Sequence, residues 1–161
     1  MKLKDYQLEQ GNHFVAMEYY ALMMNRTFLI LITDEYLIGL KTNGLISAEG
    51  GRDPLTRTIT KSMSIQNNLS NPYSYMNGKY LRELENLNIF EDKILKISNS
   101  NFRIKRQDIK TVLYDKSKKW GMAHYPHDGK VYVKIRSGKS KELIILGSQS
   151  GSDIQEWIKG S

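Results

Sequence analysis

The sequence predicts one α+β domain, an antiparallel sheet followed by a C-terminal helix, and three observations support this class. From residue 89 onward, short segments alternate apolar and polar residues, as half-buried strands do. Turn-forming residues separate these segments at short intervals. Residues 147–160 then carry apolar side chains at helical spacing, after serine and aspartate residues that can cap a helix.

The composition indicates one cysteine-free domain with no membrane-spanning segment. A chain of 161 residues is an ordinary domain length, and the lack of cysteine excludes disulfides and thiolate sites. The apolar runs at 28–32, 37–40 and 143–146 are far shorter than the roughly 18 residues that cross a bilayer. The N-terminus lacks the apolar core of a signal peptide. We therefore expect a cytoplasmic protein, and the Lys-, Ile- and Asn-rich usage points to a bacterial source.

The first half of the chain is expected to start with a helix over residues 12–24, because apolar residues recur there at intervals of three and four. These residues are Phe14, Met17, Ala21 and Met24. Residues 27–48 are predicted to form the first strands, with a tight turn at Asp34-Glu35. The continuous apolar run at 28–32 is typical of a strand covered on both faces, here by the helix before it.

Residues 49–87 are predicted to form a mainly helical insertion, of which 76–87 is the most regular part. Residues 89–158 then hold the antiparallel strands and the last helix. In that helix Ser152 or Asp153 is the expected cap, and Trp157 belongs to the buried side. The expected strands are residues 93–98, 102–106, 109–114, 119–125, 131–136 and 142–146, with a turn at 126–129.

Positive charge is concentrated in the second half of the chain. The net charge is +7, and residues 103–141 contain 12 Lys or Arg against 3 Asp or Glu. Such a segment can attract nucleic acid, anionic lipid or an acidic protein, or it can be a solvated face. Tyr132, together with Trp120 or Tyr125, could stack on bases there, or Trp120 could plug the end of the sheet. The candidate binding face is Arg103, Lys105, Lys118, Lys119, Trp120, Tyr132, Lys134 and Arg136.

No catalytic, cofactor or metal site is predicted. His124 and His127 have a spacing found among metal ligands, but a metal site needs three or four ligands and His13 is the one further histidine. The chain has no GxSxG, Walker A or GxGxxG motif. An enzyme of unrecognised class would have His124, His127 and Asp128 as its candidate residues.

Two segments give the chain a resemblance to a known superfamily. Residues 101–112, NFRIKRQDIKTV, and residues 141–158, KELIILGSQSGSDIQEWI, resemble the strand–corner–strand element and the last strand with its capping helix in bacterial pleckstrin-homology-like domains. The resemblance implies a strongly bent antiparallel sheet or partly open barrel, and a binding scaffold without catalysis. Lipid-binding members clasp inositol phosphates with a basic first hairpin, whereas Asp34-Glu35 would make this tip acidic.

The leading functional hypothesis is a non-catalytic intracellular module that binds a protein or peptide. The first alternative is binding of a polyanion, either an anionic membrane surface or nucleic acid, through the basic face over residues 103–141. The second alternative is the unrecognised enzyme. The sequence does not define the oligomeric state.

Overall fold

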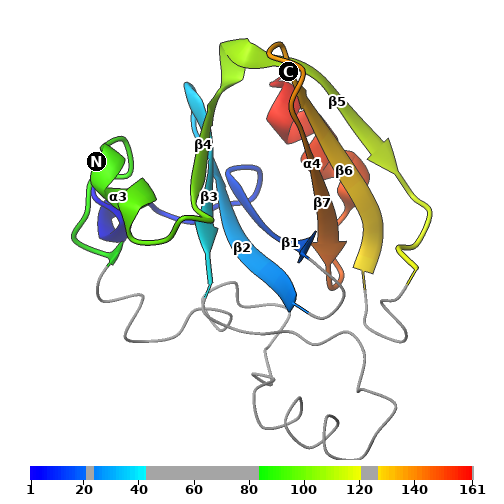
Figure 1. Cartoon of the computed structure of the whole chain (residues 1–161), viewed down its shortest axis with the longest axis horizontal. Coiled ribbons are helices and arrows are strands. Elements are labelled where there is room, and N and C mark those ends of the chain that lie inside the picture. Colours follow the sequence, from blue (N-terminus) through cyan, green and yellow to red (C-terminus); the bar gives the residue numbers. More distant parts are fainter. Residues whose placement is uncertain (21–23, 43–83, 121–126, 161) are drawn as a thin grey trace, which may run out of the picture.

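The computed structural model describes residues 1–20, 24–42, 84–120 and 127–160, and places seven strands in one antiparallel sheet (Figure 1). Across the sheet the strand order is β4-β3-β2-β1-β7-β6-β5. The strands are β1 (His13–Tyr20), β2 (Met24–Ile32), β3 (Tyr36–Lys41), β4 (Phe102–Lys105), β5 (Ile109–Asp115), β6 (His127–Ile135) and β7 (Ser140–Leu146). The helical elements are η1 (Leu3–Asp5), α3 (Asp92–Lys96), η3 (Arg106–Asp108) and α4 (Gly151–Lys159).

The sheet curls into a half-barrel. Figure 1 shows β2, β3 and β4 on one side and β5, β6 and β7 on the other, with α4 between them at one end. The edge strands β4 and β5 are joined by the η3 corner, where the Arg106 N–H donates to the Glu35 carbonyl and the Arg136 N–H donates to the Asp108 carbonyl. The predicted antiparallel sheet, its strong bend and its C-terminal helix are therefore confirmed.

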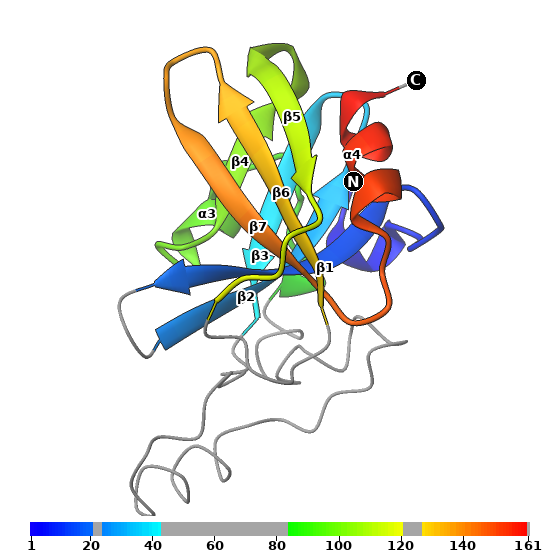
Figure 2. The same cartoon turned by 90° about the vertical axis from the view of Figure 1, so that its right-hand side faces the viewer.

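Apolar side chains cover both faces of this sheet. The inner core lies on the concave face and includes α4, while the outer core lies on the convex face and includes the N-terminal segment and α3 (Figures 1 and 2). The inner core consists of Phe14, Ala16, Phe28, Ile30, Ile32, Leu37, Ile104, Val112, Val131, Val133, Leu143, Ile145, Ile154 and Ile158. The outer core consists of Leu3, Tyr6, Val15, Met17, Leu29, Leu31, Ile38, Leu40, Leu84, Ile89, Ile94, Ile144 and Leu146.

The predicted N-terminal helix over residues 12–24 is wrong, because His13–Tyr20 forms β1 and pairs with β2 along its whole length. Phe14 points into the inner core and Val15 into the outer core. A strand that is apolar on both faces has no polar alternation, so the intervals of three and four matched a helix by coincidence. Tertiary contacts on both faces decided the conformation here.

The apolar run of β2 confirms the other expectation about this region, that one strand is covered on both faces. Phe28, Leu29, Ile30 and Leu31 are all fully buried. The cover on the convex face is not the helix predicted at residues 12–24, however. It comes from η1 and from residues 84–97, which include α3.

The strand predicted at residues 93–98 is also wrong, because Asp92–Lys96 forms the short helix α3. Ile94 and Ile97 are three residues apart, a spacing that fits one helical face as well as two strand faces. Ile94 is buried in the outer core, and Arg103 of β4 fixes the start of the helix.

The strands predicted at 102–106, 109–114, 131–136 and 142–146 are confirmed as β4, β5, β6 and β7, whereas Lys119 and Trp120, the described part of the strand expected at 119–125, lie outside any strand. The strand–corner–strand element appears as β4, η3 and β5, and Val131 and Val133 of β6 point inward. In α4, Trp157 packs against the inner core, as expected, but the N-cap is Ser150, whose hydroxyl accepts from the Asp153 N–H at 3.2 Å.

Several predictions fall outside the described residues. They include almost all of the helical insertion at 49–87, the end of the strand region after residue 42, and residues 121–126 of the expected strand and turn. Within the described chain, Leu84 joins the outer core and β6 already begins at His127. None of the helices in the described part is long and apolar enough to span a membrane.

A side-chain amide extends the pairing between β1 and β7. These strands pair at Ala16↔Ile145 and Met17↔Ile144. Beyond the end of β7, Gln149 folds back onto β1. Its Oε1 accepts from the Val15 N–H at 2.8 Å, and its Nε2 donates to the Val15 carbonyl at 2.8 Å. The amide thus replaces a further residue of β7.

We expect Gln149→Ala to lower the free energy of unfolding by about 2 kcal/mol, because it leaves part-buried backbone groups of Val15 without partners. Gln149→Glu keeps the acceptor and loses the donor, so it should fall between the alanine variant and the wild type. Urea unfolding measures both, with Ser148→Ala at an exposed neighbouring position as the control. A Gln149→Ala effect no larger than that of Ser148→Ala would contradict the role of the amide.

Candidate binding surface

The structure divides the predicted binding face among three places. Arg103 and Lys105 lie on β4, at the far edge of the sheet from β5. Arg136 lies in the turn between β6 and β7. The other five residues are close to β5 and β6. They are Lys118, Lys119 and Trp120 in the segment after β5, and Tyr132 and Lys134 on β6.

The arginines of the predicted face are engaged in contacts that hold the fold together. Arg103 donates to the Phe90 carbonyl and pairs with Asp92 at 2.7 Å, and its guanidinium lies 5.2 Å from the centre of the Tyr36 ring. Arg136 donates from Nε to the Gln107 carbonyl at 3.0 Å. Both side chains therefore join neighbouring segments of this chain.

A continuous line of side chains crosses the convex face from β1 to β5. We call it the outer strip and define it as Tyr19, Lys119, Glu142, Tyr132 and Leu113. The Lys119 ammonium lies 5.5 Å from the centre of the Tyr19 ring and 2.5 Å from a Glu142 carboxylate oxygen. Glu142 is the cross-strand partner of Tyr132, which in turn is opposite Leu113. Each member thus adjoins the next.

The outer strip exposes unusually large apolar and aromatic side chains. Leu113 is 42% exposed and Tyr19 is 37% exposed. Trp120, which follows Lys119, is 93% exposed. It therefore does not plug the end of the sheet, which was one of its two expected roles.

The charges around the outer strip leave it basic. Burial and the neighbouring Glu142 carboxylate raise the pKa of Tyr132, so its phenol stays neutral. Hydrogen bonds from Ser117 and Lys130 lower the pKa of Asp115 to about 2. Glu142 within the strip pairs with Lys119 at 2.5 Å, and Asp115 beside the strip pairs with Lys130 at 2.9 Å. The exposed lysines Lys116, Lys118 and Lys134 add positive charge.

A hollow of about 420 Å³ opens where β1 and β7 part, and we call it the notch. The Glu18–Lys141 ion pair crosses it at 2.7 Å on the side of the inner core. Lys119 crosses it on the convex side through its contacts with Tyr19 and Glu142. The lining residues are Glu18, Tyr19, Arg26, Lys119, Lys141 and Glu142.

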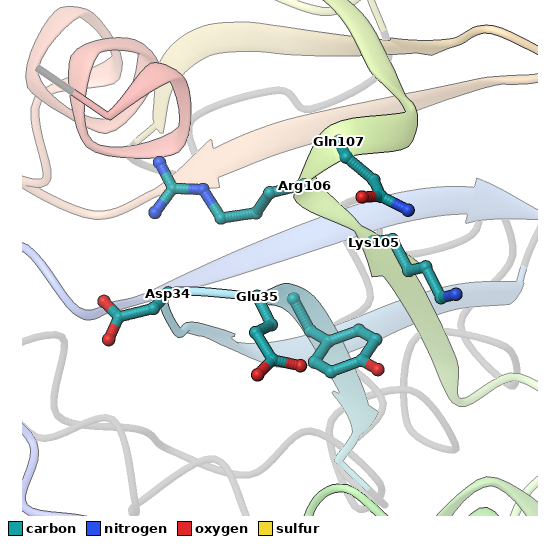
Figure 3. A pocket seen from close by; sticks show the side chains of 6 residues that line it. Asp34, Glu35, Lys105, Arg106 and Gln107 are labelled. Carbon is teal, nitrogen blue, oxygen red and sulfur yellow. The ribbon is translucent and has the colours of Figure 1, made fainter.

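A second hollow of about 320 Å³ lies beside the η3 corner (Figure 3). Figure 3 shows Asp34 and Glu35 on one wall and Lys105 on the other, while Arg106 extends toward the end of α4. The Arg106 guanidinium donates to the Trp157, Ile158 and Thr33 carbonyls. This hollow is open, and the guanidinium of Arg106 at its border is already engaged in hydrogen bonds to backbone carbonyls.

The acidic tip at Asp34-Glu35 belongs to the second hairpin of the chain. It joins β2 to β3, whereas the first hairpin joins β1 to β2 through residues 21–23, outside the described part. The expectation that Asp34-Glu35 forms the tip of the first hairpin is therefore wrong. The reason is that residues 13–20, which were predicted to be helical, form strand β1 and so add a hairpin before it.

His127 and Asp128 hold together the ends of β5, β6 and α4. His127 is 6% exposed, and its Nε2 accepts from the Lys119 N–H at 3.1 Å. The Asp128 carboxylate accepts from the Tyr114 hydroxyl at 2.9 Å and from the Gly151 N–H at 2.7 Å. His124 lies outside the described residues, and among those described no three His, Cys, Asp or Glu side chains are grouped to hold a metal.

Sequence reasoning missed Tyr19, Glu142, Leu113 and the notch. Tyr19 was assigned to a helix, although the aromatic residues of HFVAMEYY also favour a strand. Leu113 could have been found from the alternation of β5, since it separates the inward Val112 and Tyr114. No local pattern indicates the pairing of Lys119 with Glu142, because it joins distant segments.

Searches of protein-family models, curated proteins and solved structures find no match to this chain. The class of protein is therefore defined by its own geometry. It is a curled, antiparallel half-barrel closed at one end by a helix, with a basic, partly aromatic strip across its convex face.

Proposed function

We propose that the protein is a non-catalytic binding module of the pleckstrin-homology-like type, and that it binds a protein or peptide on the outer strip. The strand order, the strong curl and the position of α4 are compatible with that fold. The observation that carries the proposal is Trp120, which is 93% exposed beside a row of contacting side chains. Exposed tryptophan and tyrosine are the residues that most often dominate binding energy at protein interfaces.

The charge arrangement favours a protein partner over a polyanion. A polyanion site needs lysines and arginines that are free to meet phosphates. Lys119, Lys130 and Lys141 instead form ion pairs with carboxylates, and Arg103 and Arg136 donate to backbone carbonyls. The exposed lysines that remain fit the rim of a protein interface.

A photocrosslinking experiment tests the proposal. A photoreactive amino acid is placed at Lys118 or Lys134, both exposed at the border of the outer strip, and at Lys93 on α3 as a control. We expect protein adducts in cells from the first two positions and none from the third. Adding Trp120→Ser should reduce adduct formation about tenfold, the equivalent of about 1.4 kcal/mol of binding.

The exposed position of Trp120 lets folding and binding be separated. Trp120→Ser should leave thermal unfolding unchanged, because the side chain buries almost no surface. Equal adducts from Lys93 and Lys134 would contradict the proposal. Salt-sensitive retention by anionic vesicles or oligonucleotides, without protein adducts, would favour the polyanion alternative.

A further inference from the structure

A row of polar side chains runs beside the outer strip on the convex face, and we call it the polar row. Thr111 of β5 lies opposite Lys134 of β6, and Lys134 in turn lies opposite Ser140 of β7. Val133 and Ile135, the neighbours of Lys134 along β6, pack with the inner core, so the polar row faces outward. Directly opposed residues have Cβ atoms about 5 Å apart. One ammonium therefore stands between two hydroxyls.

The side chains of the polar row have no partner within the described part of the protein. No hydrogen bond or ion pair engages them there, whereas the lysines of the outer strip and of the notch are ion-paired. Lys134 and Ser140 are exposed, and Thr111 is half-buried. An ammonium donates three hydrogen bonds and each hydroxyl donates one. A carboxylate placed over the row can accept from all three groups, and such charge-assisted bonds are the stronger kind.

An apolar contact point lies directly beside the polar row. Leu113 and Tyr132 are cross-strand partners in the next row of the same face, two residues along each strand. Leu113 is 42% exposed. Lys134 is its diagonal neighbour, and such neighbours are about 7 to 8 Å apart. That distance is spanned by about two residues of an extended chain. One short segment can therefore place an apolar side chain on Leu113 and a charged one on Lys134.

The charge balance around this contact point is positive on both sides. The outward carboxylates of β5 and β7, Asp115 and Glu142, are each paired with a lysine, at 2.9 and 2.5 Å. Lys116 and Lys118 follow the end of β5 and are exposed, and neither forms an ion pair within the described chain. The polar row crosses β5 on the opposite side of Leu113. Leu113 is thus flanked by free cations in both directions along the strand.

We infer that the partner docks through an acidic segment, which places an apolar side chain on Leu113 and Tyr132 and an aspartate or glutamate on the polar row. This inference rests on the proposed function and names the chemistry of the partner. The carboxylate accepts from the ammonium and the hydroxyls of the polar row. A further acidic residue, on the other side of the apolar one, meets the lysines that follow β5.

Peptide display on the whole chain tests this inference. The probe is a library of random peptides of about 12 residues, which are long enough when extended to cross several strands. We expect the selected peptides to carry Asp or Glu within about two positions of an apolar or aromatic residue. Their affinity should fall as salt is added, because the charges at the border of the surface are exposed. Failure to enrich peptides, or enrichment without acidic residues, would overturn the inference.

Two charge reversals separate local recognition from net charge. Lys134→Glu should weaken binding of a selected peptide about tenfold, because it sets like charges against each other. Lys93→Glu changes the net charge equally, at an exposed position on α3, which lies beside β3 and β4 and away from β5 (Figure 1). This control should bind the peptide as the wild type does. Equal weakening by both variants would overturn the inference.

A charge exchange provides the sharpest check of the contact. A peptide whose acidic residue is replaced by lysine should bind the wild type weakly and recover binding to Lys134→Glu. Lys134 is exposed, so Lys134→Glu should unfold in urea as the wild type does. Failure of every such substituted peptide to recover binding would remove the carboxylate from the polar row and overturn the inference.

Further outcomes distinguish this inference from the proposed function. Selected peptides that lose binding in Trp120→Ser, yet bind Lys134→Glu as tightly as the wild type, would keep the outer strip as the docking surface and overturn the acidic contact. Tighter binding of a random single-stranded oligonucleotide than of any selected peptide, with the same loss in Lys134→Glu, would overturn the inference in favour of a polyanion. Absence of Trp120-dependent protein adducts in cells would contradict the proposed function itself.

Discussion

Gly129→Ala is expected to lower the free energy of unfolding by about 4 kcal/mol, through backbone strain together with steric overlap. Gly129 has a φ of +66°, a conformation that glycine adopts without strain. A Cβ at this position would lie 2.2 Å from the Asp115 carbonyl oxygen and 2.8 Å from the Lys116 Cα. Both contacts are with backbone, so β5 and β6 would have to separate.

Gly138 provides the matched control for this change. Its φ of +89° is also positive, but no atom lies within 4 Å of the position that a Cβ would take. Gly138→Ala should therefore cost only the conformational term, about 1 kcal/mol. Urea unfolding of both variants gives the comparison, and equal losses of stability would show that the close approach to Asp115 is unimportant.

Gly129 also packs against Asp115 and Lys116, at the start of the segment that carries Lys119 and Trp120 of the proposed binding surface. The turn predicted at 126–129 is wrong for its described residues, because 127–129 belong to β6. Gly129 has a positive φ within this strand, where the pairing with β7 shifts register between His127 and Lys130. At the start of the same strand, His127 accepts from the Lys119 N–H at 3.1 Å. We therefore expect Gly129→Ala to weaken partner binding as well, since it displaces the segment that carries Trp120.

Arg106→Ala is expected to lower the free energy of unfolding by about 3 kcal/mol, because it removes charged hydrogen bonds to part-buried carbonyls. The guanidinium donates to Trp157 and Ile158 at the end of α4, at 3.2 and 2.9 Å, and to Thr33 at 3.3 Å. A cation at the C-terminus of a helix also interacts favourably with the helix dipole. Loss of this side chain should release α4 from the η3 corner.

Two further variants make the Arg106 prediction specific. Arg106→Lys keeps the positive charge, but the lysine ammonium lacks the rigid planar fork with which the guanidinium donates to three carbonyls. The stability of this variant should therefore lie between those of the wild type and of Arg106→Ala. Arg136→Ala removes an exposed arginine that donates to a single carbonyl, and it should cost about 0.5 kcal/mol. Hydrogen exchange in the last turn of α4 should accelerate in Arg106→Ala. Unchanged exchange there would contradict the role of Arg106 as the link between helix and corner.

The N-terminal half shows why local periodicity fails in a doubly covered sheet. In β6 the inward Val131 and Val133 alternate with the outward Tyr132 and Lys134, so sequence alone identified both the strand and its exposed face. In β1 both faces are apolar, so the same alternation is missing and a helix was predicted instead.

The proposed binding surface was only partly predictable from the sequence, for a related reason. The basic segment at 103–141 includes Trp120, which is exposed, and Tyr132, which is half-buried. It also includes Arg103, whose partners Phe90 and Asp92 come from α3. Composition counts charges and does not reveal which of them the fold neutralises.

The sequence by itself determined the antiparallel class, the strand–corner–strand element formed by β4, η3 and β5, and the C-terminal helix, because each depends on residues close together in the chain. The tertiary structure alone decided that residues 13–20 are a strand, that Lys119 meets Glu142, and that β1 and β7 part beyond Met17. These features depend on contacts between segments up to 129 positions apart, as in the Ala16↔Ile145 pair. The residues that cover the convex face of the sheet come from other parts of the chain, so no local sequence pattern in β1 indicates that both of its faces are buried.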